Sequence, residues 1–242
     1  MHIKTTLAAL AFALATTASS TPQVAAQSYT ATTATDLATV APYQHLSDTS
    51  NAGMDSILFI YLRPNLDRYW GQTLGNMYTA PGWSWINRSG GTATACGNIT
   101  LENAAKQAAF YCPRDKVLYF NADFLQYQER QFGFPGIATV IAHEYGHHIQ
   151  NLEGWASVMT TQQEELQADR DAGAYLRWAG WTYTTNNGGI ASWYTLSDVQ
   201  GVAWAAGDYL YSDPDHHGTP SERSEAVTRG WNNGPGLSSA AI

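Results

Sequence analysis

The chain has 242 residues, of which 44% are hydrophobic and 13% are charged, and its formal net charge is −8. A chain of this length and composition is able to bury one sizeable core and needs no second domain. The acidic balance, without any cluster of lysine and arginine, argues against binding to nucleic acid or to an anionic membrane.

Residues 1–26 have the pattern of a secretory signal peptide. Lys4 precedes an apolar run at 7–15, which is followed by small and polar residues. The run is too short to span a bilayer, and no later stretch reaches the roughly 18–20 apolar residues of a spanning helix. We therefore expect no membrane anchor once the signal is cleaved, with cleavage after Ser20 and after Ala26 both compatible with the pattern.

The remaining chain divides into a lead-in and one domain. Residues 27–52 are rich in Ala, Thr and Ser and predict a flexible lead-in, and 53–242 form the domain. Export would make the protein secreted, periplasmic or exposed on the cell surface. In such an oxidising compartment Cys96 and Cys112 are expected to form a disulfide, because they lack the Cys-x-x-Cys spacing of a zinc site.

Hydrophobic periodicity in the first half of the domain predicts two helices with a small sheet between them. The helices are expected at 56–77 and 123–131, a short strand at 83–86, and the two strands of a hairpin at 109–113 and 116–121. Such a hairpin would offer an edge on which an extended peptide substrate lies, and a purely structural hairpin is the alternative.

The second half of the domain is predicted to be helical. We expect helices at 137–152, 161–180 and 199–210 and a last helix that follows residue 219. Thr161 with Glu164, and Thr219 with Glu222, have the spacing of capping boxes, and Ser197 is placed to cap the third helix.

The pentapeptide His143-Glu144-Tyr145-Gly146-His147 lies in the first of these helices. Two histidines one helical turn apart share a face, so that both imidazoles are able to reach one cation. Glu144 is placed to take a proton from a metal-activated water. Taken alone, the pattern leaves open the alternative of a helix with two ordinary histidines. His148 falls on another side and is expected at the surface or in support of the site, rather than as a ligand.

A catalytic zinc needs a third protein ligand and one open position. Glu153 is excluded, because Gln150 stands where a glycine would have to turn the backbone toward the metal. Glu165, near the start of the next helix, is the better candidate. Glu164 is the alternative, although we expect its side chain to cap that helix.

Asp169 lies one turn beyond Glu165, on the same helical face. There it would accept the free ring N–H of His143 or His147 and so fix the tautomer of that ligand. A solvated acidic face is the alternative interpretation of Glu165 and Asp169.

Short motifs elsewhere in the chain accompany these residues. They are Cys96-Gly97, Phe110-Tyr111-Cys112-Pro113, Val140-Ile141-Ala142, Glu165-Leu166-Gln167-Ala168-Asp169 and His217-Gly218-Thr219. In this order, over about 57–232, they resemble the putative neutral zinc metallopeptidase family. Three places depart from the family pattern: Tyr145, where a small aliphatic residue is usual, Arg170, and the turn at 220–223.

The resemblance implies a gluzincin-like fold: mainly helical α+β, one zincin-like domain, with a small sheet beside the motif helix. It also implies zinc on His143, His147 and Glu165, with Glu144 as the catalytic acid and base. The function predicted is a zinc metallopeptidase that hydrolyses protein or peptide substrates as a monomer.

An oxyanion formed in this reaction needs a hydrogen-bonding or positive partner besides the metal. We assign that role to His217, with Arg223 as a helper and His216 as the alternative. The alternative function is a zinc-stabilised binding protein of the same fold that does not cleave its partner.

Overall fold

The computed structural model describes residues 56–87, 91–100, 109–186, 194–210 and 216–236. The predicted signal peptide and lead-in lie outside the described residues. Within them the chain forms six α-helices, a three-stranded sheet and a two-stranded hairpin, which confirms the expected mainly helical α+β fold. The helices are α2 (Arg63–Leu74), α4 (Ala122–Phe132), α5 (Phe134–Glu153), α6 (Thr161–Asn186), α7 (Leu196–Ala206) and α8 (Pro220–Asn233). The strands are β1 (Gly82–Trp85), β2 (Thr92–Thr94), β3 (Gly97–Ile99), β4 (Ala109–Cys112) and β5 (Val117–Phe120).

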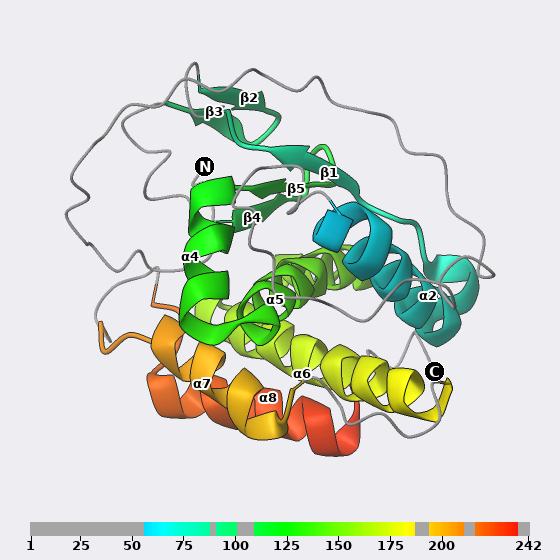
Figure 1. Ribbon diagram of the computed structural model, residues 1–242. Coiled ribbons are helices and arrows are strands. Elements are labelled where there is room, and N and C mark those ends of the chain that lie inside the picture. The colour runs from blue at the N-terminus through cyan, green and yellow to red at the C-terminus, as the bar shows by residue number, and fades with distance from the viewer. Residues whose placement is uncertain (1–55, 88–90, 101–108, 187–193, 211–215, 237–242) are drawn as a thin grey trace.

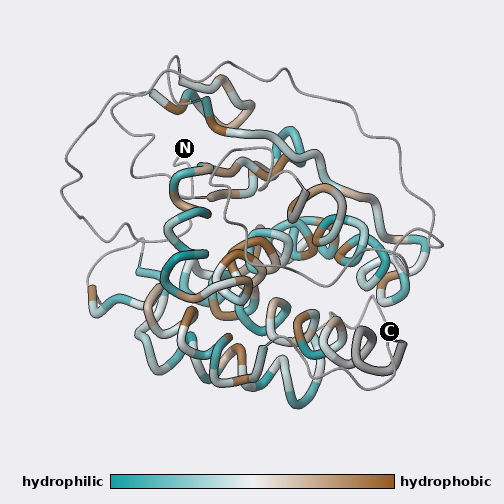
Figure 2. The backbone as a smooth tube through the Cα atoms, viewed as in Figure 1, coloured by the Kyte–Doolittle hydropathy of each residue, from teal (hydrophilic) through white to brown (hydrophobic). Residues whose placement is uncertain are grey.

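Helix α5 is the centre of the molecule. Figure 1 shows the sheet on one side of α5 and α6 on the other; α8 packs against α6, and α7 packs against α8 and α5. The backbone of α5 is among the most hydrophobic parts of the fold in Figure 2, whereas much of α4 and α8 is hydrophilic. Every residue from Phe134 to Gly146 is buried, so this part of α5 is enclosed on all its faces. No helix in the described ranges has the length and apolar character needed to cross a membrane.

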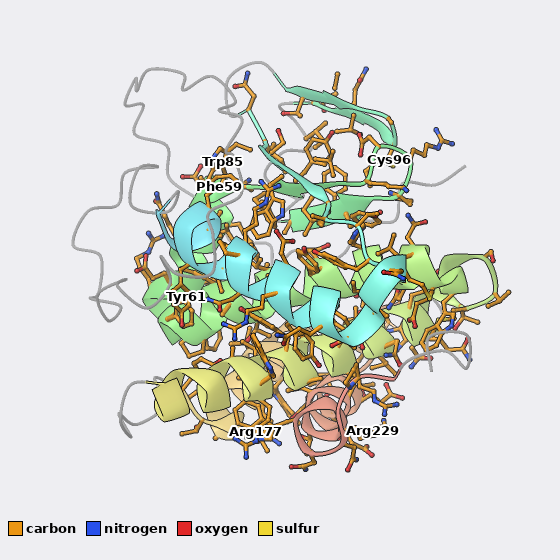
Figure 3. All side chains as sticks on the ribbon, turned by 90° about the vertical axis from the view of Figure 1, so that its right-hand side faces the viewer. Phe59, Tyr61, Trp85, Cys96, Arg177 and Arg229 are labelled. Carbon is orange, nitrogen blue, oxygen red and sulfur yellow. A yellow bond between two sulfur atoms is a disulfide. The ribbon has the colours of Figure 1, made fainter. Side chains whose placement is uncertain are left out.

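The sheet has the strand order β1-β5-β4. Strands β4 and β5 form the predicted antiparallel hairpin, with Ala109 opposite Phe120, and β1 runs parallel to β5 on its other side. All four residues of β4 are buried, because this strand packs against α5. The predicted disulfide is present between Cys96 and Cys112 and ties the β2–β3 hairpin to β4, at the end of the fold marked by Cys96 in Figure 3.

The helix predicted at 56–77 is divided into three segments. A π-helical stretch, Ser56–Leu62, leads into α2, and a short 3₁₀ turn follows at Gly75–Met77. Gly75 has a φ of 55°, which ends the α-helix there. The apolar side chains of α2 are buried as expected, but Met77 lies beyond this break and is exposed.

The cap of α6 lies one residue before the predicted position. Thr160 Oγ1 accepts from the N–H of Gln163 (3.3 Å), and the Gln163 side chain accepts from the N–H of Thr160 (2.9 Å). Thr160 and Gln163 therefore form the capping box, and the assignment of Thr161 and Glu164 to it was wrong. The adjacent Thr-x-x-Gln and Thr-x-x-Glu patterns both have the spacing of a capping box. Glu164 is only 3% exposed, so its side chain is buried in the protein interior.

The cap of α7 also differs from the prediction. Thr195 and Asp198 form a capping box at this end, so that Ser197 lies inside the helix rather than before it. The helix ends at Ala206, earlier than predicted, and the chain continues in extended form from Gly207.

Three helices cross at glycines. A Cβ on Gly146 of α5 would lie 2.8 Å from the Cα of Ala168 in α6. Cβ atoms on Gly173 of α6 and Gly230 of α8 would lie 2.2 Å and 1.8 Å from backbone oxygens of the other helix. These contacts allow the backbones of α5, α6 and α8 to approach closely, and they set the distance between the residues of the candidate site.

Candidate metal and catalytic site

Helices α5 and α6 bring three donor side chains to one point. The rings of His143 and His147 lie on one face of α5, with centroids 4.9 Å apart. Glu165 reaches them from α6: its Oε2 is 3.1 Å from Nε2 of His143, and its Oε1 is 3.4 Å from Nε2 of His147. The donor atoms of all three residues lie within 4.8 Å of one another, so a single ion would contact all of them.

The hydrogen bonding of these donor atoms fits a metal ion. Nε2 of both histidines and Oε2 of Glu165 are buried, yet none of them makes a hydrogen bond of acceptable geometry. Buried polar atoms are almost always hydrogen-bonded, and a cation bound between these three would satisfy them together. Two imidazole nitrogens and one carboxylate are a common donor set for catalytic zinc.

Charge balance supports the same conclusion. The buried guanidinium of Arg223 interacts with three carboxylates, those of Asp169, Glu165 and Glu144. With both histidines neutral, this group carries a net negative charge that a divalent cation would neutralise. Burial disfavours the protonated form of His143, but Asp169 and Glu165 nevertheless raise its pKa to about 10. The negative charges of Asp169 and Glu165 favour a bound metal ion as well as a proton on His143. Metal binding therefore competes with protonation of this ring.

A different acceptor orients each histidine. Nδ1 of His143 lies 2.8 Å from Oδ1 of Asp169, and Nδ1 of His147 lies 3.1 Å from Oε1 of Gln150. A ring that donates its Nδ1–H in this way has the lone pair of Nε2 available for a metal. The sequence left open which histidine Asp169 would hold, and the structure places it on His143.

Gln150 is a site residue that the sequence analysis missed. Its amide oxygen faces His147, and its Nε2 donates to the backbone oxygen of Glu164 (2.6 Å), which ties α5 to the start of α6. The signal was available, because a residue three positions after His147 lies on nearly the same face of the helix. Glu164 does not replace Glu165 at the histidines, and Glu153 ends α5, where its charge acts on Asp171.

Hydrogen bonds hold the guanidinium of Arg223 on several sides. The capping box of Thr219 and Glu222 starts α8 as predicted, and Arg223 lies in the first turns of that helix. Its Nε and Nη2 donate to the two oxygens of Asp169 (2.7 and 2.9 Å), and its Nη1 donates to the backbone oxygen of Ala206 (3.2 Å). Burial opposes its charge, but the neighbouring carboxylates raise the pKa of Arg223 above its ordinary value.

Glu144 is fully buried on α5 beside His143. Its negative charge acts on the guanidinium of Arg223, which also interacts with Glu165. The site thus contains one carboxylate among the candidate ligands, one that orients a ligand histidine, and a third, that of Glu144, whose role in proton transfer stays a prediction.

The predicted oxyanion residues lie on a segment that packs against Arg223. A Cβ on Gly218 would lie 3.0 Å from Leu166 Cδ2 and 3.4 Å from Arg223 Cγ, so the backbone after His217 reaches both α6 and α8. The rings of His216 and His217 are both buried. The catalytic roles of His217, His216 and Arg223 stay predictions.

His148 has a structural environment rather than a place at the metal ligands. It is fully buried, with Nδ1 3.0 Å from the hydroxyl of Tyr111 and Nε2 2.6 Å from the carbonyl oxygen of Thr79. Burial lowers its pKa to about 4, although the Thr79 carbonyl partly offsets this. The neutral ring donates to Thr79 and accepts from Tyr111, and so joins α5 to the sheet.

Tyr145, the unusual residue of the motif, also faces away from the donor atoms. Its hydroxyl donates to Asp67 of α2, which also accepts from Tyr78, and the two tyrosine hydroxyls contact each other. Figure 3 shows α2 crossing in front of the helices that carry the site. Tyr145 therefore links the motif helix to α2.

Comparison with known proteins is consistent with this geometry. A family model described as "Putative neutral zinc metallopeptidase" matches residues 15–178. The match includes the three donor residues, Glu144 and Asp169, and it ends before His217 and Arg223.

Two relatives show the same similarity over most of this chain. The uncharacterized protein Rv2575 of Mycobacterium tuberculosis is 32% identical over 227 residues, which cover 81% of this chain and 74% of that protein. The uncharacterized protein YpfJ of Escherichia coli K12 is 29% identical over 194 residues, 68% of this chain and 63% of that protein. No solved structure matches the chain.

Proposed function

Because the chain belongs to the putative neutral zinc metallopeptidase family, we propose that it is a zinc-dependent peptidase with Glu144 as its general base. The observation that carries this proposal is the convergence of His143, His147 and Glu165 within 4.8 Å of one another, beside a buried glutamate. A site built only for structural zinc would have no use for that additional carboxylate.

Bound zinc would supply Lewis acidity, which lowers the pKa of water toward about 7 and polarises a carbonyl group. The protein residues do the remaining work. Glu144 accepts a proton from the attacking water as the water oxygen bonds to the peptide carbon, and Glu144 then delivers that proton to the amine nitrogen as the C–N bond breaks. Asp169 and Gln150 hold the two imidazoles in the orientation that ligation requires.

We assign the oxyanion to His217, whose ring would donate a hydrogen bond to the oxygen that gains charge. The sequence suggested that Arg223 helps His217 at the oxyanion, but its contacts favour a role in holding Asp169. Its side chain is only 2% exposed and three of its nitrogens donate within the protein, so we assign it to positioning Asp169 rather than to the oxyanion.

We propose that the substrates are proteins or peptides outside the cytoplasm. The apolar segment at 7–15, which follows Lys4, supports export. The disulfide between Cys96 and Cys112 fits an oxidising compartment. Fractionation of cells that express the full chain, with a cytoplasmic marker as control, tests this location. Retention of the uncleaved chain in the cytoplasm would reject it.

The activity is tested by comparing wild type with Glu144→Gln on a diverse peptide library, each with and without a chelator. We expect cleavage by wild type, restored by zinc after chelation, and a loss of at least about a hundredfold in Glu144→Gln at equal zinc content. Zinc content is measured for both proteins, because Glu144 is not a ligand. Stoichiometric zinc without any Glu144-dependent cleavage would favour the alternative, a binding protein of the same fold.

A further inference from the structure

Asp208 joins two segments that meet beside the candidate site. One segment follows α7, and the other, residues 216–219, leads into α8. The side chain of Asp208 is only 11% exposed, and its Oδ1 lies 2.5 Å from Nδ1 of His216. Its Oδ2 accepts from the backbone N–H of His217 (3.2 Å) and lies 3.7 Å from the Nδ1 of the same residue.

Backbone hydrogen bonds hold Asp208 itself in place. Its N–H donates to the carbonyl oxygen of Gly218 (3.0 Å), and its Oδ1 accepts from the N–H of Leu210 (2.8 Å). Partial burial disfavours the charge of Asp208, but the hydrogen bonds that its carboxylate makes with the N–H of Leu210, with His216 and with the N–H of His217 keep its pKa below the usual value. The carboxylate is therefore charged at neutral pH, with acceptors directed to both neighbouring histidines.

The same segments are fixed to the metal site. The carbonyl oxygen of Ala206 accepts from Nη1 of Arg223, the residue that also binds Asp169. A Cβ on Gly207 would lie 2.2 Å from the nitrogen of Pro220, so the two segments touch directly at that point. A continuous chain of contacts runs from Asp208 through Arg223 to Asp169 and the first histidine ligand.

We propose that Asp208 is a positioning residue for His217: it holds the backbone N–H of His217, places its charge 3.7 Å from the ring of that residue, and is itself anchored by its contact with His216. This inference rests on the proposed peptidase activity and adds a residue to its machinery. A histidine that carries a hydrogen bond to an oxyanion must be held in place, since a displacement of about 1 Å can cost about a hundredfold in rate. Residues 216–219 form neither helix nor strand themselves, and the partly buried carboxylate of Asp208 helps to restrain them through the N–H of His217.

The test compares Asp208→Asn with wild type in the full, zinc-loaded chain. Asparagine keeps one acceptor oxygen but loses the charge and presents an N–H to one of its donors. We expect kcat to fall by about tenfold or more, with KM and zinc content changed by less than about twofold. Asp198→Asn is the matched control, because it removes the capping carboxylate of α7 without touching the site. It should leave kcat unchanged.

A double-mutant cycle separates positioning from a general loss of structure. In a His217→Gln background, Asp208→Asn should lower kcat by less than about twofold, because the residue it positions is gone. Equal losses in both backgrounds would overturn the inference. Where the asparagine variant does not fold, Asp208→Glu keeps the charge, moves the oxygens, and should show the same dependence on His217.

The outcomes also separate this inference from the proposed function. If wild type cleaves in a Glu144-dependent manner and Asp208→Asn is as active as wild type, the inference alone is rejected. If wild type shows no Glu144-dependent cleavage, the proposed function is rejected and the inference falls with it.

Discussion

Arg223 and Asp169 form a buried pair with two hydrogen bonds, from Nε to Oδ2 at 2.7 Å and from Nη2 to Oδ1 at 2.9 Å. Both side chains are 2% exposed. Because Oδ1 of Asp169 is also the partner of His143, the arginine determines where the acceptor of a metal ligand lies. The pair thus connects α8, which lies outside the ligand helices, to the metal site.

Loss of Arg223 should destabilise the protein strongly. Arg223→Met leaves Asp169 buried without its cation, and breaking a buried pair from one side costs about 3–5 kcal/mol. The matched control is Arg229→Met in the same helix, whose pair with Glu225 is 53% and 66% exposed. That change should cost less than about 1 kcal/mol. Urea denaturation in the presence of chelator measures both, and equal losses would contradict the prediction.

The two residues that orient the ligands should affect zinc binding unequally. Asp169→Asn removes a charged acceptor from His143 and should weaken zinc binding by about ten- to a hundredfold. Gln150→Ala removes a neutral acceptor from His147, so we expect a smaller loss. Competition with a chromophoric chelator measures both affinities. An Asp169→Asn variant with the affinity of wild type would show that the hydrogen bond does not support ligation.

The crossing of α5 and α6 should be sensitive to one methyl group. Gly146→Ala places a Cβ 2.8 Å from the Cα of Ala168, a backbone atom that cannot turn aside. The helices must separate, which would move Glu165 away from the histidines of α5. We expect a loss of about 1–3 kcal/mol in unfolding free energy and weaker zinc binding.

Gly201→Ala is the control for that substitution, since Gly201 lies within α7 and nothing lies within 4 Å of its Cβ position. There the methyl group should stabilise the helix by a few tenths of a kcal/mol, up to about 1 kcal/mol. A Gly146→Ala variant with unchanged stability and zinc affinity would mean that the crossing adapts without moving the ligand.

Much of this site could be predicted from the chain because its signals are local. His143 and His147 share a helical face by spacing alone, and Glu165 with Asp169 repeats that spacing one helix later. The start of α8 could also be predicted, because no second pair of residues with capping-box spacing lies next to Thr219 and Glu222. For these residues, helical geometry settles which side chains face the same way.

The remaining features depend on contacts between distant segments. The caps of α6 were ambiguous because two adjacent threonines each had a partner three residues on, and the burial of Glu164 decided between them. Arg223 was predicted to help the oxyanion because its tie to Asp169 cannot be read from spacing. Asp208 was predicted to lie within a helix at 199–210, and only the fold shows that it lies beyond the end of α7 and meets two histidines.

Asp171 should make the stability of the protein depend on pH. Burial and the charge of Glu153 raise its pKa well above the usual value of 3.8, while Gln167 and Arg170 oppose this increase. Between the usual and the raised pKa, the folded state holds a proton that the unfolded state has released. The contribution of this group to stability is therefore greatest below pH about 4. It falls by about 1.4 kcal/mol for each pH unit between the two pKa values.

Asp171→Asn removes this dependence and keeps an oxygen for the hydrogen bond from Nε2 of Gln167 (2.9 Å). We expect the variant to match wild type near pH 4 and to exceed its unfolding free energy increasingly toward pH 7. Urea denaturation of metal-free protein across this range measures the difference, and metal is excluded because zinc binding has a pH dependence of its own. Parallel stability curves would show that the folded protein binds no extra proton at Asp171. A variant that loses stability at neutral pH would show that the carboxylate is charged there and compensated by its neighbours.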